Sequence, residues 1–318
     1  MNKMAAVLTD VPCPLCRADT EAYTFGPPSL ALRRCCSCTI VFLANALCAP
    51  KYVEQMQDQF FSTGFLVRQS GWQKLFDRLN AYRTLRRIRR FKQGGRLLEI
   101  GIGNGTFLHA AIQAGFECMG IEPSSNIVRY VQETYNILIF NGYLEDFTCS
   151  PAQSTFDVIV MNHVLEHIPN PRVALKQVRS LLADKGIAHI AVPNIAGWES
   201  RLPGWTSYET YHLYYFSPST LLSLLSEVGF EVLRLETVEP FSGWFNALVR
   251  TMLGARYQFV RASEESSRGR KKTSLRWFVM SSALNTGRIV FGLLTFPIRL
   301  TQARLNKGEE LVAVVAVR

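Results

Sequence analysis

The sequence lacks the features that mark secreted, membrane-spanning and repeat proteins. Its first ten residues contain no basic start followed by an apolar run, so no secretory signal is expected there. The most apolar stretch near the end, residues 277–298, contains Arg288 at its middle and Pro297 near its end, and a charge at the centre of a bilayer is costly. No internal repeat is visible. These absences predict a globular protein of the cytoplasm, and 48% hydrophobic residues in a chain of 318 are enough for a large core.

The eight cysteines do not suggest a disulfide framework. Four of them form two Cys-x-x-Cys pairs, Cys13 with Cys16 and Cys35 with Cys38, separated by eighteen residues. Without an export signal we expect reduced thiols, and two such pairs can present four thiolates to one tetrahedral zinc ion. The sequence therefore predicts a zinc ribbon with a structural Zn²⁺. The alternative is a chance spacing in a cysteine-rich segment.

Acidic residues are scarce in one segment near the end of the chain. Residues 241–308 hold twelve of the 35 Lys and Arg but only two of the 25 Asp and Glu, so this segment carries the whole net charge of +10. Basic, aromatic and apolar residues together predict contact with an anionic surface. We interpret the segment as a helical insertion that touches anionic membrane headgroups. A soluble helical lid is the alternative, and nucleic-acid binding is less favoured.

Apolar strands alternate with helices from residue 95 to 240. Strands are expected at GRLLEIG, FECMGIE, NILIF, FDVIVMN, GIAHIAVPN and FEVLRLETV, and the terminal ELVAVVAVR predicts one more. Asn170–Pro171 and Ser217–Pro218 mark the starts of two of the helices. Apolar strands that alternate with helices indicate a parallel sheet covered on both faces. The expected fold class is therefore α/β, with a Rossmann-like, doubly wound sheet.

The changes in pattern divide the chain into four parts. Residues 51–92 form a helical connector, because GWQKLFDRLNAYRTLRRIRRF has apolar residues at spacings of three and four. The expected parts are a zinc ribbon at 1–50, the connector at 51–92, an α/β domain at 93–240 together with 309–318, and a basic, apolar helical insertion at 241–308.

A glycine-rich turn follows the first expected strand. In LLEIGIGNGTF, Glu99 precedes Gly101, Gly103 and Gly105 at the junction between a strand and a helix. Glycine lets the backbone turn tightly and approach a ligand closely. Nicotinamide dinucleotide proteins use a similar turn, but their third glycine would fall at position 106, which is a threonine here. The alternative is a turn with a purely structural role.

Glu122 ends the second expected strand, in GIEPS. An acidic side chain at this point can accept hydrogen bonds from two ribose hydroxyls. The alternative is an ordinary exposed glutamate after a strand. The glycine-rich turn upstream favours the ribose-binding role.

Four segments, in this order and spacing, resemble the class I S-adenosylmethionine-dependent methyltransferases: EIGIGNGTF, GIEPS, FDVIVMNHVLEHIPNP and KGIAHIAVPN. The resemblance covers roughly residues 95–240 and the last strand. VLEHIPNP and HLYYFSPSTL are similar to a methyltransferase-23-like subgroup that acts on saccharides or small molecules and often follows a zinc ribbon. The resemblance implies a seven-stranded sheet with an antiparallel last strand. It also implies S-adenosylmethionine (SAM) bound over the carboxyl ends of the strands.

The same resemblance implies a set of cofactor-binding residues at four strand ends. The family often has a Gly-Asp pair near the adenine after the third strand, whereas NGYLEDF here has Tyr143 at that place, with Leu144 and Glu145 beside it. The methionine part would pass the glycine-rich turn, and the sulfonium would lie near the end of the fourth strand. The expected residues are Glu99, Gly101, Gly103, Gly105, Glu122, Tyr143, Leu144, Glu145, Asn162 and His163.

Two histidines are predicted catalytic residues. SAM supplies an activated methyl group, so the protein has to align the nucleophile, and a base helps if the acceptor is a hydroxyl or an acidic carbon. His163 lies nearest the expected methyl group, and His212 lies in YETYHLYYF, where the resemblance places acceptors. The alternative for either is a packed loop histidine, and His167 is expected to hold its loop. Aromatic residues between 198 and 211 either line an acceptor pocket or form the core of that loop.

The sequence thus predicts an enzyme that transfers a methyl group from SAM to an oxygen or carbon nucleophile. The expected acceptor is a small molecule, a sugar or a lipid-linked saccharide. The insertion at 241–308 favours a lipid-linked acceptor and peripheral contact with the inner face of the cytoplasmic membrane. One alternative is an RNA methyltransferase that uses the ribbon for RNA recognition, although the ribbon is not strongly basic. The other is a non-catalytic SAM-binding scaffold, against which the intact glycine-rich turn argues.

Overall fold

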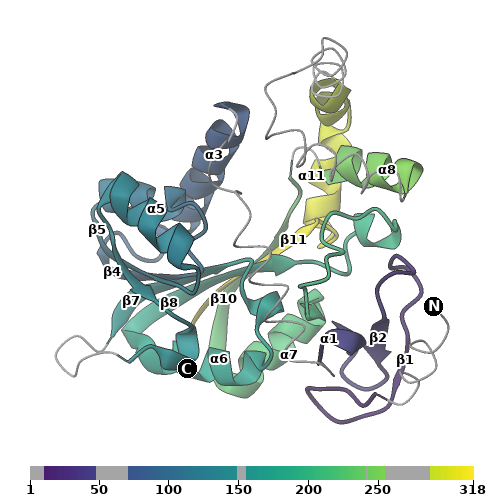
Figure 1. Cartoon of the computed structure of the whole chain (residues 1–318), viewed down its shortest axis with the longest axis horizontal. Helices are drawn as coiled ribbons and strands as arrows, with labels where there is room; N and C mark the ends of the chain where they lie inside the picture. The colour runs from purple at the N-terminus through teal and green to yellow at the C-terminus, as the bar shows by residue number, and fades with distance from the viewer. Residues whose placement is uncertain (1–10, 48–70, 149–154, 241–242, 255–286) are drawn as a thin grey trace.

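A computed structural model describes residues 11–47, 71–148, 155–240, 243–254 and 287–318. In these residues, seven strands form one sheet in the order β10-β11-β8-β7-β4-β5-β6 (Figure 1). β11 is antiparallel to both of its neighbours, and the other neighbouring pairs are parallel. The predicted α/β fold with an antiparallel last strand is confirmed. The strands are β4 (Gly95–Ile100), β5 (Phe116–Glu122), β6 (Leu138–Asn141), β7 (Phe156–Asn162), β8 (Leu182–Pro193), β10 (Phe230–Val238) and β11 (Glu310–Val317).

The central strands are buried because successive side chains point into two different apolar layers. In β7, Val158 and Val160 face one layer, and Ile159 and Met161 face the other. α3, α4 and α5 cover the first layer, whereas α6 and α7 cover the second (Figure 1). The helices are α3 (Gly71–Ile88), α4 (Thr106–Gln113), α5 (Ser125–Tyr135), α6 (Pro171–Leu181) and α7 (Pro218–Val228).

Local signals set the starts of the helices in this domain. The Asn170 side chain accepts a hydrogen bond from the Val173 backbone N–H at 3.3 Å, directly before Pro171. Ser217 and Thr220 form a reciprocal capping box at the start of α7. Both predicted starts are confirmed, because an Asn or Ser side chain satisfies backbone N–H groups that have no partner within the helix.

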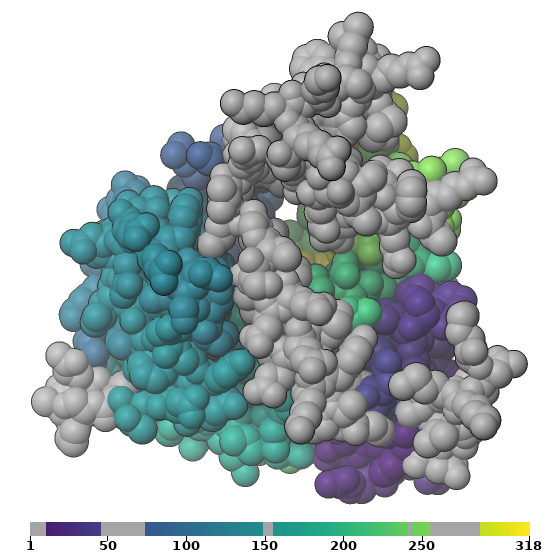
Figure 2. Space-filling view, viewed as in Figure 1, coloured from purple at the N-terminus to yellow at the C-terminus, as the bar shows by residue number. Residues whose placement is uncertain are grey.

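The cysteine-rich segment forms a second, four-stranded sheet with one strand from the far side of the sequence. Its order is β1-β2-β3-β9, and β3 pairs antiparallel with β9 through Val41 opposite Tyr215 and Phe42 opposite Tyr214. Figure 2 shows these N-terminal residues, in purple, against the green surface of the later part of the chain. β1 (Thr20–Ala22), β2 (Leu32–Cys35), β3 (Val41–Leu43), α1 (Ala44–Leu47) and β9 (Tyr214–Tyr215) make up this region. The segment therefore contacts the loop that follows β8.

The expected helical connector and insertion are described in part. The connector contains α3, and the insertion contains α8 (Gly243–Leu253) and α11 (Phe296–Arg304). Residues 51–70 of the expected connector, and residues 241–242 and 255–286 of the expected insertion, lie outside the described residues. In the part of the chain that the structure describes, no helix is long and apolar enough to span a membrane.

Candidate active site

The glycine-rich turn joins β4 to α4 in a conformation that needs glycine. Gly101, Gly103 and Gly105 have φ angles of 74°, 51° and 74°, in the left-handed region that favours glycine. The Gly101 N–H donates to the Ile121 carbonyl at 2.9 Å, so the turn is held to the end of β5. An ideal Cβ on Gly103 would meet nothing within 4 Å. The turn therefore offers an open backbone surface to a ligand.

Alanine in place of Gly101 is expected to destabilise the fold more than alanine in place of Gly103. Both positions have positive φ, which costs a non-glycine residue roughly 1–2 kcal/mol. Only at Gly101 would the new Cβ also lie 2.5 Å from Cγ2 of Val164, and such overpacking adds about 1–3 kcal/mol. Urea unfolding of the two variants measures the difference. Equal losses of stability would contradict the packing argument.

Two buried carboxylates lie beside the turn. Glu99, in β4, and Glu122, at the end of β5, are 3% and 2% exposed. The Ser124 backbone N–H donates to Oε1 of Glu122 at 3.0 Å, and Oε2 of Glu99 has no hydrogen-bond partner among the described residues. Burial raises the pKa of Glu122 to about 7, and burial together with the charge of Glu122 raises the pKa of Glu99 well above its ordinary value. Both carboxylates can thus still accept hydrogen bonds from a ligand.

The stretch after β6 begins with one exposed aromatic ring. Tyr143 is exposed, Leu144 is buried in the core, and Glu145 is exposed in the short 3₁₀ helix η2 (Leu144–Asp146). The Gln177 side chain donates to the Leu144 carbonyl at 2.5 Å, which ties this stretch to α6. Leu144 can therefore offer a ligand backbone atoms rather than its side chain.

His163 lies between two carboxylates at the end of β7. Its Nδ1 is 3.3 Å from Oε1 of Glu166, and its Nε2 is 3.1 Å from Oε1 of Glu310. Surrounding protein atoms lower the pKa of His163 by desolvation, although its side chain is 51% exposed. The hydrogen bonds to both carboxylates outweigh this effect and raise the pKa well above its ordinary value. The residue also has a φ of 54°, which is uncommon outside glycine and concentrates at functional sites.

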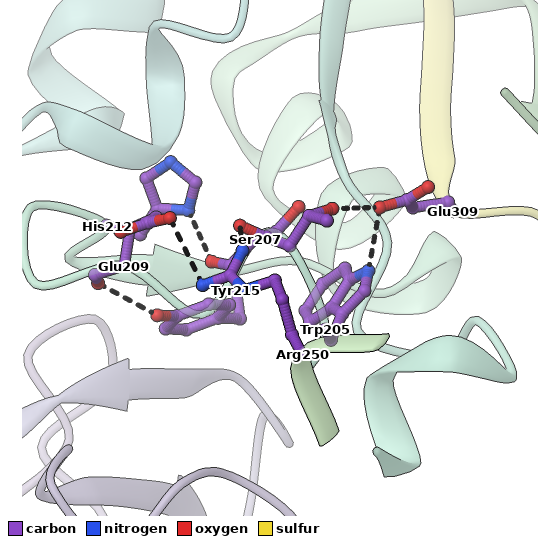
Figure 3. A network of polar contacts seen from close by, with 8 residues as sticks. Trp205, Ser207, Glu209, His212, Tyr215, Arg250 and Glu309 are labelled. Carbon is purple, nitrogen blue, oxygen red and sulfur yellow. Dashed lines mark hydrogen bonds and ion pairs between the residues drawn. The ribbon is translucent and has the colours of Figure 1, made fainter. Parts of the chain in front are cut away.

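His212 is buried in the loop between β8 and α7. Its Nδ1 donates to the Ser207 carbonyl at 2.8 Å (Figure 3). A carbonyl can only accept, so this bond leaves Nε2 of His212 as a hydrogen-bond acceptor or metal ligand. Burial lowers the pKa of His212 to about 3, and nearby His167 adds to the effect. The ring is therefore neutral.

The same loop is fixed by contacts with α8 and β11 (Figure 3). Arg250 of α8 donates to the Thr206 carbonyl at 3.0 Å and lies 3.5 Å from Oε1 of Glu209. Trp205 Nε1 and Thr206 Oγ1 donate to the buried carboxylate of Glu309, which precedes β11. Residues far apart in sequence thus hold the loop in one conformation.

The aromatic residues of this loop divide between two roles. Trp205 and Tyr208 are buried, and their rings meet edge to face at 5.0 Å, so they form the core of the loop. Trp198 and Tyr211 are half-buried, so part of each ring lies at the surface. The prediction that these aromatic residues form the core of the loop is therefore correct for Trp205 and Tyr208.

Sequence reasoning missed two carboxylates of this site. Glu166 lies in the 3₁₀ helix η4 (Leu165–His167), is completely buried, and contacts His163. Glu310 begins β11, nearly 150 residues further along the chain. The two histidines that flank Glu166 in HVLEH were a local signal for its role. Nothing in the sequence near Glu310 indicated contact with His163.

The four predicted zinc ligands come together. Cys13 Sγ lies 3.6 Å from Cys38 Sγ, and Cys16 Sγ lies 3.4 Å from Cys35 Sγ. All four sulfur atoms lie within 4.8 Å of one another. Tetrahedral zinc with Zn–S bonds of about 2.3 Å has sulfur atoms about 3.8 Å apart, so this cluster fits such an ion. The Ser37 and Cys38 N–H groups each donate to Cys35 Sγ at 3.3 Å, whereas Cys36 is exposed and outside the cluster.

Comparison with known proteins places this fold in a family. A family model described as a methyltransferase domain matches residues 71–235, slightly more than half of the chain. An uncharacterized methyltransferase of Alkaliphilus oremlandii is 34% identical over 103 residues, 31% of this chain and 46% of that protein. A ubiquinone biosynthesis O-methyltransferase of Glaesserella parasuis is 29% identical over 109 residues, 32% of this chain and 46% of that protein. The matched segments thus span less than half of each relative.

Likeness to a solved structure supports the fold but not a particular activity. A candidate sarcosine dimethylglycine methyltransferase from Galdieria sulphuraria superposes with a TM-score of 0.50 at 14% identity, over 83% of this chain and 97% of that one. The strand order and the family match agree with this likeness. The chain therefore belongs to the methyltransferase domain family, and its Rossmann-like sheet is that of a SAM-dependent methyltransferase.

Proposed function

We propose that this enzyme transfers a methyl group from SAM to an oxygen or carbon nucleophile of a small molecule, a sugar or a lipid-linked saccharide. One observation supports this most directly. The glycine-rich turn, Glu122, His163 and the loop of His212 follow the carboxyl ends of β4, β5, β7 and β8, which are neighbours in the sheet. Ligands of open α/β sheets bind at this edge.

The residues present fit SAM. The backbone at Gly103 is open. The buried carboxylate of Glu122 accepts backbone hydrogen bonds from Ser124 and Ile102, and because a carboxylate has about four lone-pair sites it can also accept from ribose. We assign the methionine part to Gly101, Gly103 and Gly105 and the ribose to Glu122, with Glu99 behind them. The stretch Tyr143, Leu144 and Glu145 would contact the adenine through the exposed ring or backbone atoms. Asn162 and His163 would lie at the sulfonium end.

When bound, SAM supplies a methyl group that is already activated by the positive sulfur. The residues of this chain then have to bind the acceptor, orient its nucleophile and exclude water. His163 is held between Glu166 and Glu310, so its ring is fixed at the end of β7. His212 presents Nε2 as an acceptor atom, because its Nδ1 is used by Ser207. His163, whose two nitrogens both donate to carboxylates, is our candidate for holding the acceptor. His212, whose Nε2 keeps its lone pair, is our candidate for receiving the acceptor's proton.

The last helix supports contact with a lipid surface. α11 buries Arg299 and Gln302 and exposes Phe296, Ile298 and Leu300. The Arg299 guanidinium donates to the Gly292 carbonyl at 2.7 Å, so its inward position is stabilised. The same helix also exposes Thr301 and Arg304, so its outer surface combines apolar and basic side chains and favours an interfacial partner surface. This arrangement and the basic charge of residues 241–308 support a lipid-linked acceptor.

The test is a methyl-transfer screen with isotopically labelled SAM and the full chain. We expect a lipid-linked saccharide in anionic vesicles to be labelled faster than the same saccharide without its lipid. Faster labelling of the water-soluble form would contradict lipid contact and leave a small-molecule or sugar acceptor. Salt-sensitive labelling of RNA would favour the RNA methyltransferase. Tight binding of S-adenosylhomocysteine (SAH) without labelling of any acceptor would favour the non-catalytic scaffold.

The zinc ribbon is part of the same proposal. The four thiolates of Cys13, Cys16, Cys35 and Cys38 would hold a structural Zn²⁺ with no open coordination position. Through β3 and β9 the ribbon contacts the segment that immediately follows His212. We infer that the ribbon positions the acceptor loop rather than recognising RNA.

A further inference from the structure

We propose a second metal site, formed by Glu166, His167 and His212, that binds a divalent transition-metal ion and, through it, an oxygen atom of the acceptor. The metal site stands on the geometry of these three side chains. Its role toward the acceptor rests on the proposed function. The metal site also restricts the proposed acceptors to those that offer an oxygen atom to the ion.

The three side chains meet from two separate segments. Each offers one ligand atom, and these atoms lie within 4.8 Å of one another. Glu166 and His167 come from η4 after β7, and His212 comes from the loop after β8. The Leu213 N–H donates to the Glu166 carbonyl at 2.8 Å, and the rings of His167 and His212 are 4.8 Å apart. The backbone therefore holds the two segments together.

Both histidines are oriented as metal ligands are. Nδ1 of His167 lies 3.0 Å from the Tyr211 carbonyl, and Nδ1 of His212 lies 2.8 Å from the Ser207 carbonyl. Because a carbonyl only accepts, each Nδ1 carries the hydrogen and each Nε2 keeps its lone pair. Metal-binding histidines commonly donate their other N–H to a carbonyl or carboxylate, which sets the tautomer and the ring orientation.

Glu166 supplies a buried negative charge with unused capacity. Its side chain is 0% exposed, and in the described part of the chain its Oε2 has no hydrogen-bond partner. The ion pair with His163 reaches Oε1 at 3.3 Å and leaves Oε2 without a partner there. The protonated His163 compensates Oε1, but a buried carboxylate oxygen without a partner is costly unless a further donor or cation reaches it. A divalent ion between Glu166 and the two histidines would do so.

The ligand set selects the kind of ion. Two imidazoles and one carboxylate suit Zn²⁺, Fe²⁺ or Co²⁺ rather than Mg²⁺, which prefers oxygen ligands. Ligand atoms about 2.1 Å from such an ion lie roughly 3.0–3.4 Å apart, so a pair of ligand atoms 4.8 Å apart would approach by about 1.5 Å on binding. Three protein ligands leave at least one coordination position open. We assign that position to an acceptor oxygen, which His212 would then orient through the ion. With the metal bound, Nε2 of His212 is a ligand and no longer receives the acceptor's proton.

The test is a Co²⁺ titration of the full chain loaded with one equivalent of Zn²⁺, which the four thiolates take first. We expect one equivalent of Co²⁺ to bind by calorimetry, with visible cobalt absorption and no thiolate charge-transfer band. Glu166→Gln and His212→Gln should each weaken Co²⁺ binding by more than about tenfold. His109→Gln, a change of the same kind in α4 outside the cluster, should bind Co²⁺ as the wild type does.

SAH binding is measured on every sample. It distinguishes a wrong metal site from a misfolded variant and from a wrong proposed function. If His212→Gln also loses SAH binding, its fold is in doubt, and His167→Gln, at a half-buried position, replaces it as the test variant. A wild type that binds no Co²⁺ beyond the ribbon zinc overturns the metal site, as does a set of variants that bind it unchanged. Co²⁺ binding without SAH binding would leave the metal site standing and overturn the proposed function.

Discussion

Glutamine in place of Glu122 is expected to weaken SAH binding by roughly tenfold to a hundredfold and to stabilise the fold above pH 7. In the proposed site the carboxylate accepts hydrogen bonds from ribose hydroxyls. Hydrogen bonds to a charged group contribute about 1.5–3 kcal/mol, which corresponds to this change in affinity. Calorimetric titration with SAH at pH 8 measures the loss.

The gain in stability has a defined pH range. Burial raises the pKa of Glu122 from 4.5 to about 7 in the folded protein. Between these values the folded state holds a proton that the unfolded chain has lost, so the free energy of unfolding falls as the pH rises through this range. Above pH 7 the free energy of unfolding of the wild type is about 3 kcal/mol lower than it would be with an unshifted Glu122. Glutamine does not ionise, so urea unfolding should find the variant more stable than the wild type at pH 8 and similar to it at pH 4.

Glu117→Gln is the matched control. Glu117 lies on the same strand, β5, but its side chain is exposed. The same chemical change there should alter neither SAH affinity nor the pH dependence of stability. An E122Q variant that binds SAH as the wild type does would remove Glu122 from the cofactor site, even if the gain in stability were found.

Serine in place of Cys35 is expected to remove one zinc ion per chain, lower the Tm by roughly 10 °C and abolish turnover of the acceptor. Loss of a structural zinc removes several kcal/mol of folding free energy, and about 3 kcal/mol corresponds to such a shift in a domain of this size. Turnover should fall because β3 pairs with β9 and the Leu43 N–H donates to the Leu213 carbonyl at 2.9 Å, next to His212. SAH binding should persist, because β4 and β5 do not pair with the ribbon.

Cys36→Ser provides the control for that experiment. Cys36 is adjacent in sequence, exposed and outside the thiol cluster, so its serine variant should keep zinc, Tm and turnover. Zinc content by elemental analysis, thermal unfolding and labelled methyl transfer give the three measurements. Full turnover in a zinc-free Cys35→Ser protein would show that the ribbon does not position the acceptor loop.

Local chemistry was enough to predict most of the fold. The strand FDVIVMN is apolar on both faces, and that pattern is typical of a central strand in a sheet covered by helices. The turn from Gly101 to Gly105 could be identified because three alternate positions in it have positive φ angles, which favour glycine. The thiol cluster followed from spacing alone, because each Cys-x-x-Cys pair places two sulfur atoms on one short turn.

The sequence was a poorer guide to which face of each helix is buried. In α3 the spacing of apolar residues predicted a helix, and a helix is present. Leu85 and Ile88 are buried, whereas Leu75, Leu79 and Tyr82 are exposed. In α11 the polar side chains of Arg299 and Gln302 are the buried ones. Periodicity predicts the helix, but the neighbouring elements determine which face is covered.

The amino-acid sequence was thus sufficient for the sheet, the glycine-rich turn, the acid at the end of β5 and the cluster of four thiols. Each of these depends on residues close together in the chain. Three-dimensional packing alone brings His163 against Glu310, His212 against Glu166, and β9 onto the ribbon. The partners in these contacts are separated by about 50 to 170 residues. No local propensity encodes such pairs, because they form only when the sheet brings the ends of distant strands to one edge.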